Sequence, residues 1–168
     1  MSTKTATAVL EGSGLRFSVA TGSGHTVVVD DGDGGTGPRP AELVVVAQAG
    51  CTAMDVIFIL RKKRQDVRRY EVHVEGIQRD ADHPHVFERM DVLHVVEGPA
   101  VEVEAVRRAI ELSATRYCTV TANLSAGLAE IHHRYRVRSA DGTAVEGEAV
   151  ITGPDGRVEV VSPALATP

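Results

Sequence analysis

The sequence predicts a domain that mixes strands and helices around one long apolar helix. Residues 43–60 read LVVVAQAGCTAMDVIFIL, and only Gln48, Thr52 and Asp55 in this run are clearly polar. Before and after the run, apolar and polar residues alternate over short stretches, which is typical of half-buried strands. A helix that is apolar on almost every side is either buried or in a membrane. We therefore expect residues 43–60 to form the centre of the fold.

The ends of this run also favour a helix. Pro40 precedes it and suits a first helical turn. The basic residues 61–64 follow it, and cations stabilise the C-terminal end of a helix. The same basic cluster is open to a second interpretation as a localisation or nucleic-acid patch, but we favour the helix end. A buried strand at 43–46 is the alternative for the first valines, although the run is too long for an ordinary strand.

A membrane helix is the competing interpretation, because about 18–20 apolar residues are enough to span a bilayer. Asp55 argues against it, since a carboxylate at the bilayer centre costs about 2.5–3.5 kcal/mol. No second apolar run follows in the sequence. For these two reasons we expect no membrane. A soluble helix without a polar face must be covered on all sides, so we expect a second copy of the chain to cover it.

The length and the net charge of the chain limit which classes of protein it can belong to. The 168 residues suffice for one domain with an appendage. A formal charge of −5, from 18 basic and 23 acidic side chains, argues against a general nucleic-acid partner. The N-terminus has no apolar signal core, which predicts a cytoplasmic location. We expect no metal and no cofactor, because neither the Asp- and Gly-rich loop 30–38 nor the loop 82–85 shows a complete ligand set.

The remaining elements are assigned by their periodicity. Residues 6–31 predict a three-stranded meander, and residues 70–75 and 86–96 predict a hairpin. In the second of these strands the apolar phase slips between Val92 and Leu93, which indicates either a bulge or burial on both faces.

The C-terminal half should continue with helices and then strands. Residues 101–114 predict a second helix with Glu104 and Arg108 paired on its outer side, and a shorter helix should run from Cys118 to Gly127. A cysteine in a first helical turn has its thiolate stabilised by the helix dipole.

A strand over residues 131–137 would place His132 and His133 on opposite faces. Residues 143–161 predict a hairpin that is either an edge of the sheet or loosely attached, and 162–168 a disordered tail. We divide the chain into a domain of residues 1–138 and an extension of residues 139–168.

The two cysteines have a plain interpretation and a chemical one. Cysteine is among the most buried residue types and packs as a small apolar side chain, so Cys51 taken alone is more often inert. The long separation of Cys51 and Cys118 matches no local redox motif such as C-x-x-C. From the spacing alone, both interpretations stay open.

Four motifs resemble the OsmC/Ohr family of thiol-dependent hydroperoxide reductases. They are GPRPAEL at 37–43, AGCTAMDV at 49–56, RAIELS at 108–113 and YCTV at 117–120. The segment ILRKKRQDV at 59–67 is similar to the YhfA-like branch of that family. The resemblance spans residues 6–138 and leaves out the C-terminal extension.

The resemblance implies an α+β fold and an intertwined homodimer, with the long helices packed between two sheets. It implies that Cys51 attacks a peroxide as a thiolate and becomes a sulfenic acid. Cys118 would then condense with Cys51 to a disulfide, which an external dithiol reduces. The implied substrate is an organic or hydrogen peroxide, and the implied enzyme is an oxidoreductase of the oxidative stress response.

The sequence departs from the family beside Pro40. The family's active-site Glu directly follows the Pro, where this chain has Ala41, and Glu42 comes one residue later. Arg16 and Arg39 are the candidate cations for activating Cys51, and we expect them to matter more than Glu42. The alternative hypothesis is a non-catalytic dimer of the same fold that binds a small apolar or acyl ligand.

Overall fold

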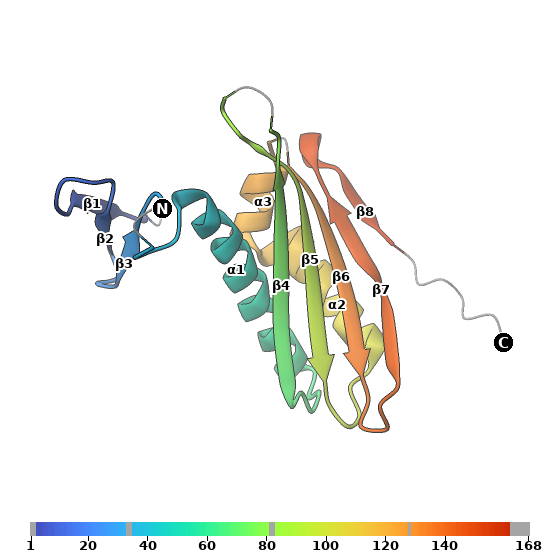
Figure 1. Cartoon of the computed structure of the whole chain (residues 1–168). Coiled ribbons are helices and arrows are strands. Elements are labelled where there is room, and N and C mark those ends of the chain that lie inside the picture. Colours follow the sequence, from blue (N-terminus) through green and yellow to red (C-terminus); the bar gives the residue numbers. More distant parts are fainter. Residues whose placement is uncertain (1–2, 33–34, 81–82, 128, 162–168) are drawn as a thin grey trace. The chain divides into compact units, whose positions relative to one another are not determined.

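The computed structural model describes residues 3–32, 35–80, 83–127 and 129–161 (Figure 1). The chain forms two compact units, residues 1–45 and 46–168. The predicted disordered tail, residues 162–168, lies outside the described residues. The helices and strands of each unit confirm the expected α+β class.

The first unit is an antiparallel meander of β1 (Ala6–Leu10), β2 (Phe17–Thr21) and β3 (Thr26–Val29). The strands pair in the order β1-β2-β3, as the sequence predicts. Gly12 and Gly24 occupy the two turns with φ of 75° and 86°. Only glycine adopts such angles without a steric cost, so these residues allow the tight reversals.

The long helix α1 (Pro40–Lys62) begins in the first unit and continues through the second. The Glu42 carboxylate accepts a hydrogen bond from the Arg39 N–H at 2.7 Å, which satisfies a free donor at the helix start. Arg61 and Lys62 lie in the last turn, so the helix replaces the alternative strand at 43–46. By length and composition α1 could cross a membrane, a test that the core helix of a soluble protein also passes.

The second unit contains a five-stranded sheet in the order β4-β5-β6-β7-β8. Its strands are β4 (Arg69–Gln78), β5 (Phe87–Glu97), β6 (Glu130–Arg138), β7 (Ala144–Thr152) and β8 (Val158–Val160). Neighbouring strands are antiparallel except for β5 and β6, which are parallel. A parallel pair requires a crossover, and α2 (Val103–Leu112) and α3 (Thr119–Ser125) supply it on one face of the sheet (Figure 1).

The bulge that the sequence suggested in β5 is absent from the β4–β5 pairing between Val92 and Leu93, which continues in register. The register shifts instead at Ile77/Gln78 in β4. The apolar phase of β5 slips because both Val95 and Val96 are buried. Burial on both faces, the second alternative, is therefore the explanation.

The second helix is shorter than residues 101–114, because a π-helical turn, Ser113–Tyr117, follows α2. The expected pair of Glu104 with Arg108 is wrong. Glu104 pairs with Arg107 at 2.7 Å, and Arg108 pairs with Glu111. Both pairs span three residues, a spacing that brings helical side chains together as well as four does.

The hydrophobic core of the second unit joins its helices to the sheet. Its fully or almost fully buried members include Val56, Leu60, Val106, Ile110, Tyr135 and Val150. Ala149 and Val150 of β7 belong to this core, and β7 pairs along β6. The C-terminal hairpin is therefore part of the sheet and not a loosely attached piece.

Candidate active site

The two cysteines come together in the second unit. The Sγ atoms of Cys51 and Cys118 and a carboxylate oxygen of Asp55 all lie within 4.8 Å of one another. Cys51 and Asp55 are one helical turn apart on α1 and so share a face. Cys118 immediately precedes α3. Both thiols are free.

Cys118 lies at the start of α3 but not as a stabilised thiolate. Its side chain is 2% exposed, and its Sγ accepts a hydrogen bond from the Thr121 N–H at 3.3 Å. Burial, aided by a hydrogen bond with Cys51, raises the pKa of the Cys118 thiol to about 11. The expected effect of the helix start is thus outweighed by desolvation, which disfavours the charged form.

Asp55 is the acidic member of the cluster and is half-buried. Burial raises the pKa of its carboxyl, and a hydrogen bond from Ser113 Oγ at 3.1 Å partly opposes that shift. Ser113 Oγ also lies 3.1 Å from Thr52 Oγ1. A short polar chain therefore crosses from α1 to the π-helical turn.

In the sequence, Asp55 argues against a membrane helix and lies within the motif at 49–56. Its spacing of four residues from Cys51 was the signal that both share one helix face. Ser113 gave no such signal, because only the tertiary structure brings the π-helical turn to α1.

A cavity of about 640 Å³ borders Asp55. Its lining residues are Asp55, Phe58, Ile59, Lys62, Lys63, Leu112 and Tyr117. The walls are mainly apolar, and two lysines add positive charge. Such a cavity suits a molecule with an apolar body.

Arg16, Arg39 and Glu42 belong to the first unit, whereas both cysteines belong to the second. Arg16 pairs with Glu11 at 2.9 Å, and Arg39 donates from Nε to the Asp31 carbonyl at 2.7 Å. Glu42 accepts from the Arg39 N–H. Their part in activating Cys51 stays a prediction.

Two buried histidines lie on the inner face of the sheet. His94 Nδ1 is 2.8 Å from Tyr70 Oη, and the His94 and His133 rings stack with centroids 6.2 Å apart. Burial lowers the pKa of both imidazoles, that of His133 to about 3. His132 lies on the opposite face of β6, so it and His133 do not form a metal-binding pair, as the strand alternation predicts.

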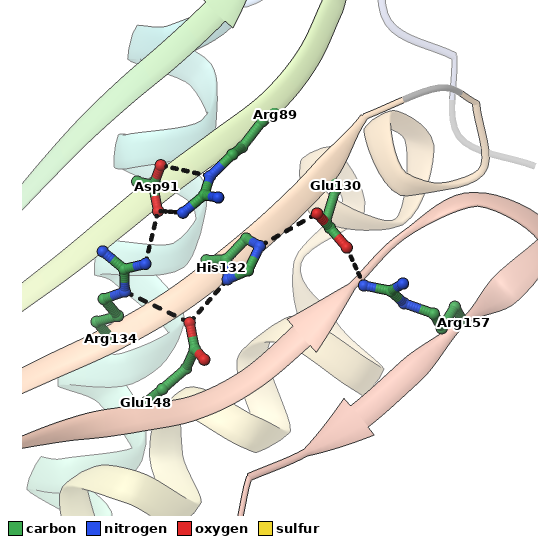
Figure 2. Close-up of polar contacts among 7 residues, drawn as sticks. All are labelled: Arg89, Asp91, Glu130, His132, Arg134, Glu148 and Arg157. Carbon is green, nitrogen blue, oxygen red and sulfur yellow. Dashed lines mark hydrogen bonds and ion pairs between the residues drawn. The ribbon is translucent and has the colours of Figure 1, made fainter.

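Figure 2 shows His132 within a network of charges on the other face of the sheet. Asp91 pairs with Arg89 at 2.7 Å and with Arg134 at 3.2 Å. His132 lies 2.8 Å from Glu148 and 3.2 Å from Glu130. Arg134 of β6 pairs across strands with Asp91 of β5 and with Glu148 of β7. Cross-strand charge pairs stabilise a sheet, so we interpret this network as structural.

The fold and the adjacent thiols define an α+β protein with a dithiol site. The profile of the OsmC-like protein family matches residues 32–131, and the chain belongs to that family. Protein YhfA of Escherichia coli K12 is 38% identical over 127 residues, which cover 76% of this chain and 93% of that protein. The resemblance that the motifs indicated is thereby confirmed.

Solved structures agree with this assignment. A hypothetical protein of Aquifex aeolicus VF5 is 28% identical with a TM-score of 0.71, and the match covers 83% of this chain and 98% of that one. An organic hydroperoxide resistance protein of Elizabethkingia anophelis is 18% identical with a TM-score of 0.56, covering 83% of this chain and 97% of that one. At this lower identity the likeness shows the fold alone.

Proposed function

We propose that this protein is a thiol-dependent peroxidase that reduces organic or hydrogen peroxide. The observation that carries the proposal is the approach of two free thiols, Cys51 and Cys118, to within 4.8 Å from distant parts of the sequence. A structural disulfide is unusual in the cytoplasm, where we propose that the protein works. A thiol pair at this distance is suited to reversible oxidation.

In the proposed cycle Cys51 is the attacking thiolate, because it is half-buried while Cys118 is buried. Its sulfur takes the outer oxygen of the peroxide, the O–O bond breaks, and the alkoxide leaves with a proton as an alcohol. Cys118 then attacks the Cys51 sulfenic acid, and a disulfide and water form. An external dithiol returns both thiols by exchange.

The cavity beside Asp55 supports an organic substrate. Phe58, Leu112 and Tyr117 offer apolar contacts to an alkyl or aryl body. The name of the Elizabethkingia protein, organic hydroperoxide resistance, agrees with this substrate class. Arg16 or Arg39 would supply the positive charge that a thiolate requires.

We also propose that the functional unit is a homodimer. Three apolar side chains of α1 are largely exposed in the single chain: Val46 at 60%, Met54 at 73% and Phe58 at 68%. Exposed apolar patches on soluble proteins mark interaction sites. A second copy would cover this face of α1.

The same cavity also favours a second candidate function, that of a non-catalytic dimer which binds a small apolar or acyl ligand. Its apolar lining would hold such a ligand without any chemistry at the thiols. Ala41 in place of the family's Glu agrees with this candidate.

Peroxide consumption with a dithiol reductant separates the two candidates. We expect turnover of cumene hydroperoxide by the wild type, none by Cys51→Ser, and none beyond the first oxidation by Cys118→Ser. Mass spectrometry should find a Cys51–Cys118 disulfide in the oxidised wild type. Wild-type protein that consumes no peroxide while it binds an apolar probe would favour the binding protein.

A further inference from the structure

Three potential metal ligands converge in the second unit. Sγ of Cys51, Sγ of Cys118 and a carboxylate oxygen of Asp55 lie within 4.8 Å of one another. Two of them come from successive turns of α1 and the third from the residue before α3. The backbone therefore brings these three donor atoms close together. A disulfide between the two cysteines would not require the Asp55 carboxylate beside them.

Neighbouring groups hold two of these ligands in place. Ser113 Oγ donates to Asp55 Oδ2 at 3.1 Å, and the Thr121 N–H donates to Cys118 Sγ at 3.3 Å. Ser113 also contacts Thr52 on α1. Hydrogen bonds from a second layer of residues orient the ligands of metal sites and are typical of them.

The donor set selects the class of metal ion. Thiolates favour soft and borderline ions such as Zn²⁺, whereas Ca²⁺ and Mg²⁺ are bound by oxygen ligands. Zn–S bonds of about 2.3 Å at a tetrahedral angle place two sulfurs about 3.8 Å apart. That separation falls within the 4.8 Å limit of the cluster. Three protein ligands leave one position of a tetrahedral zinc site for water.

We propose that reduced Cys51 and Cys118, together with Asp55, bind one thiophilic divalent ion, Zn²⁺ being the probe of choice. Binding replaces the protons of the two thiols by the ion. When a peroxide oxidises the site, two sulfur-held electrons reduce the O–O bond and the Cys51–Cys118 disulfide forms. Two protons complete the alcohol and water, and Zn²⁺ leaves with its charge unchanged.

The metal ion and the disulfide therefore exclude each other at this site. Bound Zn²⁺ occupies both sulfurs, so it should protect the thiols from alkylation and slow their oxidation. This inference does not depend on the proposed peroxidase, because metal binding to the reduced chain is measured without turnover.

The test measures Zn²⁺ binding to the reduced full-length protein by equilibrium dialysis. We expect one ion per chain for the wild type and a loss of at least about 10-fold in affinity for Asp55→Asn, since removing even an outer-shell partner costs that much. Cys51→Ser and Cys118→Ser should lose more of the affinity for Zn²⁺ than Asp55→Asn does. Asp66→Asn is the matched control, because this exposed carboxylate pairs with Arg68 and stands outside the cluster.

Two further measurements make the result decisive. Co²⁺ in place of Zn²⁺ should give a thiolate-to-metal absorption band that Cys51→Ser and Cys118→Ser lack. Wild type oxidised by hydrogen peroxide should lose binding and regain it on reduction, a comparison that needs no variant to fold. The double Cys51→Ser/Cys118→Ser protein keeps every histidine and measures background binding. The proposal would be overturned if the wild type bound Zn²⁺ no more strongly than this double variant. It would also be overturned if Asp55→Asn bound Zn²⁺ as strongly as the wild type.

Discussion

At the scale of single residues, the two thiols of the site have different surroundings. Cys118 is buried and accepts one backbone hydrogen bond, whereas Cys51 is half-buried on α1. Burial raises the pKa of Cys118 to about 11, so its thiol is protonated at neutral pH. Since only the thiolate is a nucleophile, Cys118 should react late.

Alkylation with iodoacetamide at neutral pH should therefore modify Cys51 before Cys118. We expect peptide mapping to find Cys51 modified at least about 10-fold faster, because access and ionisation both limit Cys118. Cys118→Ser serves as the control and should keep the Cys51 rate within about threefold. Equal rates at the two cysteines would contradict the assigned roles.

The activation of Cys51 is tested by the same rate measured against pH. If a guanidinium supplies the charge, Arg16→Ala or Arg39→Ala should move the profile toward higher pH, since loss of a nearby cation disfavours the thiolate. Glu42→Ala should leave it in place, because Glu42 caps the start of α1 through the Arg39 N–H. A profile that changes only in Glu42→Ala would show that the acid, and not an arginine, acts on Cys51.

At the scale of elements, the two faces of β5 and β6 carry different chemistry. Alternation places Met90, Val92, Ile131 and His133 inside and Asp91 and His132 in the charge network of Figure 2. A strand that slipped by one residue would exchange these faces. The polar face thus helps to specify the register of the sheet.

Replacing Asp91 by Asn should lower the free energy of unfolding by about 1 kcal/mol, toward the upper end for partly exposed pairs. The variant leaves Arg89 and Arg134 close together without the carboxylate between them. Urea unfolding measures the change. Glu88→Gln, on the same strand but without an ion pair among the described residues, should have almost no effect, and an equal loss there would refute the role of the network.

The buried histidines predict how stability depends on pH. His133 has a folded pKa of about 3, against about 6.5 in an unfolded chain, and burial lowers the pKa of His94 as well. Below pH 6.5 the unfolded chain gains protons that the folded chain does not. The free energy of unfolding should thus fall with pH from about 6.5 to about 3, by up to about 1.4 kcal/mol per pH unit for each histidine.

Urea unfolding at pH 7 and pH 5 tests this dependence. His133→Phe should flatten it, because phenylalanine fills a similar volume and does not titrate. The exposed residue His25 provides the control His25→Gln, which should keep the wild-type slope. An unchanged slope in His133→Phe would mean that His133 does not limit stability in acid.

At the scale of the whole molecule, the apolar face of α1 predicts an obligate dimer. Val46, Met54 and Phe58 are exposed in the single chain, and obligate interfaces are large and apolar. Sedimentation equilibrium at micromolar concentration should give twice the mass of 17.9 kDa. Phe58→Glu should dissociate or unfold the dimer, while Val145→Glu, at an exposed position of β7, should not. A stable, well-folded wild-type monomer would contradict the prediction.

The sequence by itself determined most of the elements and the family. Apolar runs and alternation depend on neighbours within a few residues, so α1, the meander and the strands of the sheet could be predicted. The motif around Cys51 and the segment beginning at Tyr117 identified both thiols. The parallel pairing of β5 with β6 and the shift of register at Ile77/Gln78 could not be predicted from the sequence, because both depend on which strands pair with each other.

Only the tertiary structure decided the composition and the electrostatics of the site. Asp55 already shares a helix face with Cys51, but Ser113 contacts Asp55 only because the fold brings the π-helical turn against α1. Cys118 lies at a helix start, where local rules favour a thiolate, yet its burial raises the pKa of the thiol. Solvation is set by all the chain segments that surround a group, and a local sequence pattern contains no record of them.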